Sequence, residues 1–487
     1  MHPARAYSEY GLNKMSNVKG NIIYSIILTV STYIVNFIIF PYITRVLGAE
    51  EFGTIGFATQ TVSFFILFAM LGIGTLGIRE IAACGDDAER RSRVFSSLLI
   101  FSLITTVIVS VAYIFAIAVT DKMRENSTLM IIGLSRLIFN TILVEWFFRG
   151  IERFKYISLC SIIIKTVYII AVFLLVKEES DADIYYALTC AVVVVNAIVN
   201  ILYARRFVRF SFKGIELRRY FKPLMQIGSY SIITAAYTTF NVIYLGLVNT
   251  DTEVGYYYAA TRIYAIILNM YTAFTNVMFP RASLLLAKND MDSHRNSIRL
   301  SFEILFVFAL PIIAVCTIMG GDIILLLSGD DFVDAITPFK MIIGLILIVG
   351  IAQIIVMQVL IPRHEDSTLL RASVIGAVVG TVANILLVKD YGAIGSAVVL
   401  LCSECAVFAY YIYYVLRHKL LQIPFDIIGK QCLAAIPYFA ICYACSVMGT
   451  GLLIKTLVCA TLCGLYFLFV QIYVFKYSAV KSLLKLE

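Results

Sequence analysis

Long apolar segments separated by short polar joints run through almost the whole chain, from Asn21 to Tyr477. Each segment is long enough to cross the hydrocarbon core of a bilayer as an α-helix, a structure that satisfies its own backbone hydrogen bonds there. The pattern predicts about fourteen transmembrane helices, near 21–44, 54–77, 94–119, 128–149, 156–176, 184–203, 223–247, 255–279, 300–327, 336–361, 370–388, 392–416, 431–449 and 452–475. We therefore expect an all-α polytopic membrane protein.

The composition agrees, because 61% of the 487 residues are hydrophobic and only 14% are charged. A net charge of +8 would also suit a nucleic-acid-binding protein, but its distribution indicates membrane topology. The joints of one side hold 29 of the 39 basic residues, and those of the other side hold 6. Because basic residues favour the cytoplasmic side, both termini are predicted to be cytoplasmic.

Two stretches of sequence indicate an internal repeat. Residues 51–60 (EFGTIGFATQ) and 253–262 (EVGYYYAATR) share several residues at a constant offset, and Arg79 corresponds to Arg281 at the same offset. An even number of helices separates the copies, so the repeat is parallel, with its axis along the membrane normal. The sequence predicts two parallel-repeat six-helix bundles followed by two C-terminal helices.

The expected organisation has five parts. They are a cytoplasmic lead (1–20), an N-terminal lobe (21–203), a basic cytoplasmic linker (204–222), a C-terminal lobe (223–416), and two extra helices with a cytoplasmic tail (417–487).

Four sequence motifs carry a family resemblance. They are LGAEEFG (47–53), EWFFRGIERFKYIS (145–158), VGYYYAATRI (254–263) and YGAIGSAV (391–398). With these motifs the chain resembles the multidrug/oligosaccharidyl-lipid/polysaccharide exporter superfamily, and within it the Wzx-type flippases of O-antigen and capsular repeat units. The resemblance implies a flippase that moves an undecaprenyl-diphosphate-linked oligosaccharide from the inner to the outer leaflet of the bacterial cytoplasmic membrane by alternating access of two lobes.

Charged residues inside membrane segments often have a functional or pairing role, because inserting each one at the bilayer centre costs roughly 2.5–3.5 kcal/mol. Arg262, Lys165 and Arg136 lie well inside their segments, with no obvious acid on a neighbouring helix for the first two. Cations in such a setting suit an anionic ligand. We expect these three to form a cationic, substrate-binding surface of a central cavity.

Polar residues recur on single faces of several segments. Arg262, Asn269 and Asn276 follow heptad spacing, so one helix face is polar along its length. The residues predicted to line the cavity are Asn36, Tyr237, Asn241, Asn269 and Asn276. For any single Asn or Thr of this kind, hydrogen bonding between packed helices is at least as good an explanation as lining a cavity.

The intramembrane acids divide into two kinds. Glu145 precedes Arg149 by four residues, so an intrahelical ion pair explains it without a function. Glu404 has no such local partner, and it either pairs with a basic residue in the C-terminal bundle or carries a coupling proton. Lys340 lies nearer a helix end, where it either snorkels to the interface or takes part in such a pair.

No metal site or catalytic residue is predicted. The 11 cysteines lie mainly in apolar segments, and all four histidines lie in cytoplasmic joints, so the cysteines read as packing residues. A polysaccharide polymerase or ligase would need catalytic groups in sizeable outer loops, and every outer joint is short. We expect no enzyme activity and no cofactor, apart from coupling to H⁺ or Na⁺.

Two alternatives remain within transport. They are a lipid II flippase and a cation-coupled drug or metabolite antiporter of the same superfamily. The antiporters typically carry acids in the N-terminal lobe, whereas the first two segments here have none in their cores. The expected partners are the lipid-linked oligosaccharide and membrane lipids, with a polymerase and glycosyltransferases as further candidates.

Overall fold

The computed structural model describes residues 3–211 and 214–474, and every regular element in them is helical. The chain divides into two compact units, Met1–Leu247 and Val248–Glu487, which are described separately. This confirms the predicted all-α class.

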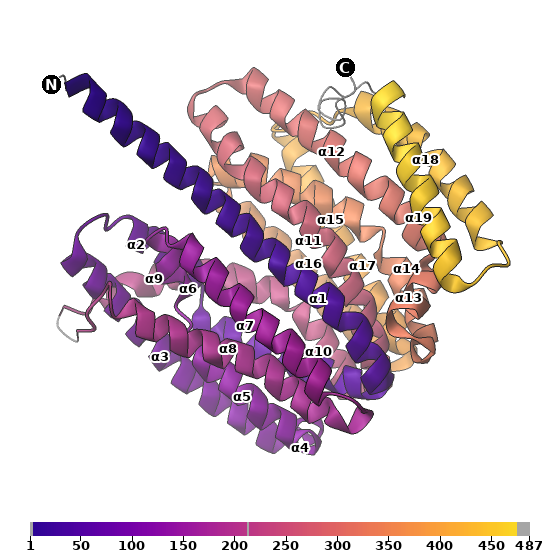
Figure 1. Cartoon of the computed structure of the whole chain (residues 1–487), viewed down its shortest axis with the longest axis horizontal. Helices are drawn as coiled ribbons and strands as arrows, with labels where there is room; N and C mark the ends of the chain where they lie inside the picture. Colours follow the sequence, from indigo (N-terminus) through magenta and orange to yellow (C-terminus); the bar gives the residue numbers. More distant parts are fainter. Residues whose placement is uncertain (1–2, 212–213, 475–487) are drawn as a thin grey trace. The chain divides into compact units, whose positions relative to one another are not determined.

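The first unit contains the elements coloured from indigo to magenta in Figure 1. They are α1 (Pro3–Met70), α2 (Ile73–Ala82), α3 (Ala88–Val119), α4 (Asp121–Glu125), α5 (Ser127–Thr141), α6 (Glu145–Gly150), α7 (Phe154–Leu175), the short η1 (Glu179–Asp181), α8 (Ala182–Ala204), α9 (Leu217–Ala235) and most of α10 (Thr239–Val248).

Breaks within and between the predicted segments redirect the chain. Helix α1 covers the first predicted segment and most of the second, which are joined at a kink where Gly48 has φ 69° and ψ −178°. It also begins at Pro3, inside the stretch predicted as a polar lead. The fourth segment is broken between α5 and α6, where Val144 has φ 41°. The seventh is split into α9 and α10, bent by 45°.

Aromatic residues of the EWFFRG motif form part of the first unit's core. Trp146, Phe147 and Phe148 are all buried. Helix α2 packs closely on α6 because Gly77 has no side chain: a Cβ there would lie 2.4 Å from Cε3 of Trp146. The motif therefore has a packing role at the joint between helices.

The basic linker (204–222) is docked on α3 where it is described. Serine hydroxyls of α3 accept its backbone N–H groups, from Arg209 to Ser92, from Ser211 to Ser96 and from Glu216 to Ser97, each at 3.1 Å. Lys213 lies outside the described residues.

The boundary between the compact units lies one segment later than the predicted lobe boundary. Helix α9 packs on α1, α2 and α3, so the seventh segment joins the first unit. The contact is close because Gly228 lies against Leu71, with a Cβ at 228 only 3.0 Å from the Leu71 backbone. The sequence predicts this segment (223–247) as part of the C-terminal lobe.

The second unit holds the remaining elements. They are α11 (Asp251–Ala287), α12 (Met291–Ile318), α13 (Gly320–Ser328), η2 (Asp330–Ala335), α14 (Ile336–Ile342), α15 (Leu345–Ile354), η3 (Ile355–Leu360), η4 (Ile361–Arg363), α16 (Asp366–Ala383), η5 (Asn384–Val388), α17 (Lys389–Arg417), α18 (Phe425–Ser446), α19 (Leu452–Phe469) and η6 (Val470–Val474). Here η3, η5 and η6 are π-helical, and the tenth predicted segment is divided among α14, α15, η3 and η4.

Eleven helical stretches of the described chain are long and apolar enough to cross a membrane, or twelve when the bent pair α9 and α10 counts as one span. Two of these stretches, Ile27–Met70 and Asp366–Arg417, each contain two predicted segments joined at a glycine kink, Gly48 or Gly392. Each of the fourteen predicted segments therefore has a helical counterpart, and the protein is a multi-pass membrane protein.

Candidate functional site

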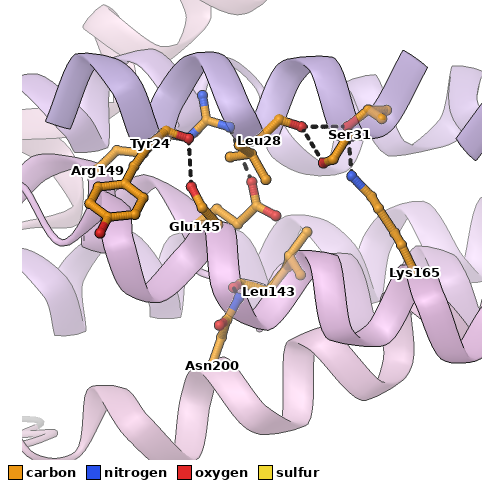
Figure 2. Close-up of polar contacts among 10 residues, drawn as sticks. Tyr24, Leu28, Ser31, Leu143, Glu145, Arg149, Lys165 and Asn200 are labelled. Carbon is orange, nitrogen blue, oxygen red and sulfur yellow. Dashed lines mark hydrogen bonds and ion pairs between the residues drawn. The ribbon is translucent and has the colours of Figure 1, made fainter. Parts of the chain in front are cut away.

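The best-defined polar site in the first unit is built around Lys165 of α7. Its Nζ donates a hydrogen bond of 2.6 Å to Oγ1 of Thr32 on α1 (Figure 2). The Thr32 hydroxyl donates its own proton to the carbonyl of Leu28 at 3.0 Å, so its oxygen is free to accept from the ammonium. The ammonium has three N–H donors, and Thr32 is its one hydrogen-bond acceptor among the described residues.

Further hydrogen bonds hold α1 against α7 beside this lysine. Ser158 of α7 donates to the carbonyl of Tyr24 at 2.7 Å, and Ser31 donates to the carbonyl of Leu28 at 2.8 Å (Figure 2). The polar face predicted on the fifth segment therefore packs on α1, while Lys165 itself stays half-exposed. Its position is fixed from both helices.

An acid lies nearer to Lys165 than the sequence indicated. The predicted intrahelical pair is confirmed, with Arg149 Nη2 3.2 Å from Glu145 Oε2. The same Glu145 carboxylate is close enough to Lys165 to interact electrostatically. The local cluster of Glu145, Arg149 and Lys165 holds two cations and one acid, and so keeps a net positive charge.

Arg136 of α5 lies elsewhere in the same unit. It is half-buried, with Tyr186 and Cys190 of α8 within electrostatic reach. Asn36 of α1 is half-buried as well. In the part of the chain that the structure describes, no hydrogen bond or ion pair joins either residue to Lys165, so a shared surface for Arg136 and Lys165 stays a prediction.

Tyr237 and Asn241 lie at the bend between α9 and α10. They are 4% and 0% exposed, so both pack between helices in this conformation. Such burial is typical of polar residues that hold helices together. Their role in lining a cavity stays a prediction.

In the second unit, Arg262 lies on α11. Its guanidinium carbon lies 5.0 Å from the ring centre of Tyr258, one turn earlier on the helix. This cation–π contact orients the guanidinium. Along the same predicted stripe, Asn269 is half-buried and Asn276 is exposed.

Glu404 and Lys340 do not form an ion pair with each other. Glu404 is half-buried on α17, within electrostatic reach of Tyr264, and no salt bridge involves it in the described part of the chain. Lys340 is exposed on α14, and its stem lies over Gly320. Their roles in coupling stay predictions.

Two groupings in this unit had no signal in the sequence. Lys455 Nζ lies 2.6 Å from Asp322 Oδ1, and both side chains are largely buried. The sulfur of Cys442 lies 3.6 Å from that of Cys459 and 3.7 Å from that of Cys463. These three cysteines therefore form one cluster between α18 and α19. From the sequence, each of them is interpreted as an individual packing residue.

Comparison with known proteins identifies the family. Residues 18–286 match the model of the family described as "Polysaccharide biosynthesis protein", which is more than half of the chain. The chain belongs to this family. It is 24% identical over 420 residues to the "Putative O-antigen transporter" of Escherichia coli (strain K12), covering 84% of this chain and 99% of that relative.

Solved structures show that this family member has the fold of known exporters. A lipid II flippase, MurJ, in an inward closed conformation superposes with a TM-score of 0.74 and 14% identity, over 94% of this chain and 100% of that one. An inward-facing multidrug resistance transporter of the MATE family, in the MOP superfamily, gives a TM-score of 0.58 and 12% identity, over 82% and 94%. These structures show the fold, and the family match to residues 18–286 confirms the resemblance that the motifs indicate.

Proposed function

We propose that this protein is a flippase that moves undecaprenyl-diphosphate-linked oligosaccharide repeat units from the inner to the outer leaflet of the bacterial cytoplasmic membrane by alternating access. Its family and its O-antigen transporter relative support transport of a lipid-linked glycan. In this proposal both termini are cytoplasmic, as the distribution of basic residues predicts.

The observation that carries the proposal is the half-exposed ammonium of Lys165 and its single hydrogen-bond acceptor among the described residues. Its ammonium lies within a membrane-spanning helix, half-exposed, with one hydrogen-bond acceptor among the described residues. The net positive charge of its cluster and the open N–H donors suit the oxygens of a diphosphate. Such a ligand would offset the cost of holding a cation in the membrane.

Two further cations complete the proposal. Arg136 adds a guanidinium from the first unit, and Arg262 adds one from the second, set over Tyr258. A guanidinium offers paired donors that match phosphate oxygens, so each is suited to the same substrate group. Coupling to H⁺ or Na⁺ is part of the proposal, and Glu404 is the acid to test for it.

The test is transport by the purified chain in liposomes that contain a fluorescent undecaprenyl-diphosphate oligosaccharide. The fraction reaching the opposite leaflet is read by a membrane-impermeant quencher. Lys165→Met should lower the rate by about tenfold or more, the factor expected when hydrogen bonds to a charged group are lost. Lys177→Met, the same change at an exposed joint, should transport normally.

Thr32→Val tests whether transport depends on the charge of Lys165 or on the hydrogen bond that positions its ammonium. It removes the acceptor for Lys165 but keeps the ammonium, so it should retain most of the transport that Lys165→Met loses. Wild-type rates in Lys165→Met would contradict the binding role. Faster movement of lipid II than of the oligosaccharide carrier would instead favour the alternative substrate.

A further inference from the structure

Three cysteine side chains meet between α18 and α19, which pack side by side in the second unit (Figure 1). Cys442 comes from α18, and Cys459 and Cys463 come from α19. The Cys442 sulfur lies 3.6 Å from the Cys459 sulfur and 3.7 Å from the Cys463 sulfur. All three sulfurs lie within 4.8 Å of one another, so the two helices present them to one point.

The sulfurs are close enough for one atom to bind all three. A zinc–thiolate bond is about 2.3 Å long and bonds to other thiophilic ions are similar, so two sulfurs on one ion lie at most about 4.6 Å apart. Both separations measured from Cys442 are well below this limit. Cys459 and Cys463 are four residues apart on one helix, so they face the same side. Small side-chain movements are therefore enough to close the three sulfurs around an ion.

The cluster lies in an apolar interior. Cys442, Cys459 and Cys463 are 0%, 1% and 7% exposed, and they belong to an apolar core that α12, α18 and α19 share. The single charged residue of α19, Lys455, is already paired with Asp322. A net charge left among these sulfurs would be costly, because an uncompensated charge is unfavourable in an apolar interior. A ligand that suits this cluster must therefore leave it uncharged.

We propose that Cys442, Cys459 and Cys463 form a binding site for a trivalent thiophilic element, arsenic(III), which arrives as arsenous acid, As(OH)₃. Cysteine binds such ions as the thiolate. Three thiolates leave two negative charges around Cu⁺ and one around Zn²⁺, and zinc also takes a fourth ligand. Around a trivalent ion they leave no charge. The apolar surroundings therefore select arsenic(III) over these two metals.

The reaction at the three sulfurs is a ligand exchange without an oxidant or a reductant. Three S–H bonds and three As–O bonds break, three As–S bonds form, and arsenic stays in the +3 state. Each thiol proton leaves with one hydroxide as water. The product is an uncharged arsenic trithiolate that joins α18 to α19.

Access to the buried sulfurs follows from the position of α19. This helix packs mainly on α18 and α13, and Cys463 is its most exposed member of the cluster. Local opening at such a helix requires much less free energy than global unfolding. Arsenous acid is small and uncharged at neutral pH, so it can pass through apolar surroundings during such an opening. The site is separate from Lys165 and does not depend on the transported substrate.

The test is mass spectrometry of the intact full chain after incubation with arsenite. The parent protein for this test carries alanine in place of the exposed Cys402, Cys405 and Cys432, so that these thiols cannot react. It should gain one arsenic atom and lose three hydrogens. Binding through two sulfurs would keep one hydroxyl on arsenic, and that product would contradict the three-sulfur site.

Single substitutions assign the sulfurs. Cys459→Ala and Cys463→Ala should each lose the three-sulfur product. Cys445→Ala removes another buried thiol of α18 that is not part of the cluster, so this variant should form the product as the parent does.

Thermal unfolding supplies a second readout. Arsenite should raise the melting temperature of the parent by about 2 °C or more, because it binds the folded arrangement, and should leave that of Cys459→Ala unchanged. Comparing each variant with and without arsenite separates lost binding from lost stability. The proposal is overturned if the parent binds no arsenic, or if Cys459→Ala still forms the three-sulfur product.

Discussion

The carboxylate of Glu253 accepts a hydrogen bond of 2.6 Å from the backbone N–H of Ala393, a residue 140 positions later in the chain. Glu253 lies in the first turn of α11, and Ala393 follows the kink of α17. The bond links the start of the eighth predicted segment to the joint between the eleventh and twelfth. Ala393 belongs to one motif that carries the family resemblance, and Glu253 directly precedes another, so these two motifs meet in the fold.

Gly392→Ala should destabilise the protein by about 2 kcal/mol or more, because its φ of 50° is unfavourable for other residues. A Cβ there would also lie 2.3 Å from Glu253 Oε2, so the bond to Ala393 must move. Thermal unfolding of the purified protein measures the effect. Gly449→Ala is the matched control, because Gly449 lies in a loop and an added Cβ there would have no neighbouring atom within 4 Å. Equal melting temperatures for the two variants would show that the kink tolerates a side chain.

Arg262→Ala should abolish glycan export while the amount of protein in the membrane stays nearly unchanged. Arg262→Lys should retain part of the activity, because the charge survives but the planar donor pair does not. Glycan display in cells that lack the native gene measures export, and immunoblotting of membranes measures abundance. Arg295→Ala, at an exposed position of α12, is the control. Normal export by Arg262→Ala, or loss of the protein, would make Arg262 a structural residue.

Opposite sides of the membrane are predicted for Arg209 and Asp331, both exposed. Cysteines introduced there, after replacement of the exposed Cys402, Cys405 and Cys432, should differ in labelling by an impermeant maleimide on intact cells. Position 331 should be labelled, and position 209 only after permeabilisation. His294 is buried against the carbonyl of Gln358, so it is a poor reporter of the inner side. Labelling of both positions from one face would refute the topology.

The pair of Lys455 and Asp322 should act as a unit, because both side chains are largely shielded. Asp322→Leu or Lys455→Met alone leaves a shielded charge without its partner, and each should destabilise the protein by about 1–3 kcal/mol. The double variant should be more stable than either single variant. Thermal unfolding of the wild type, the two single variants and the double variant gives the four stabilities of a double-mutant cycle. Additive losses would show that the two charges do not interact.

The sequence by itself determined the class, the approximate spans and the local pairings. Apolar segments long enough to cross a membrane predicted helices, and the structure contains these helices. The prediction works because backbone N–H and C=O groups in lipid must form hydrogen bonds within the protein, and a helix provides them. The pair of Glu145 and Arg149 was also predictable, since residues four apart on a helix are neighbours. The motifs were sufficient for the family, which the match to residues 18–286 confirmed.

Only the tertiary structure decided which polar groups meet. Lys165 and Thr32 are 133 residues apart, and hydropathy along the chain carries no signal for such a contact. Kinks at Gly48 and Val144 interrupt helices that hydropathy shows only as apolar runs. The electrostatic contact between Glu145 and Lys165 likewise joins two different helices. Burial of Asn241 and the clustering of the three cysteines also depend on how neighbouring helices pack. Side-chain direction is set by the backbone path in three dimensions, and that path depends on contacts between distant segments.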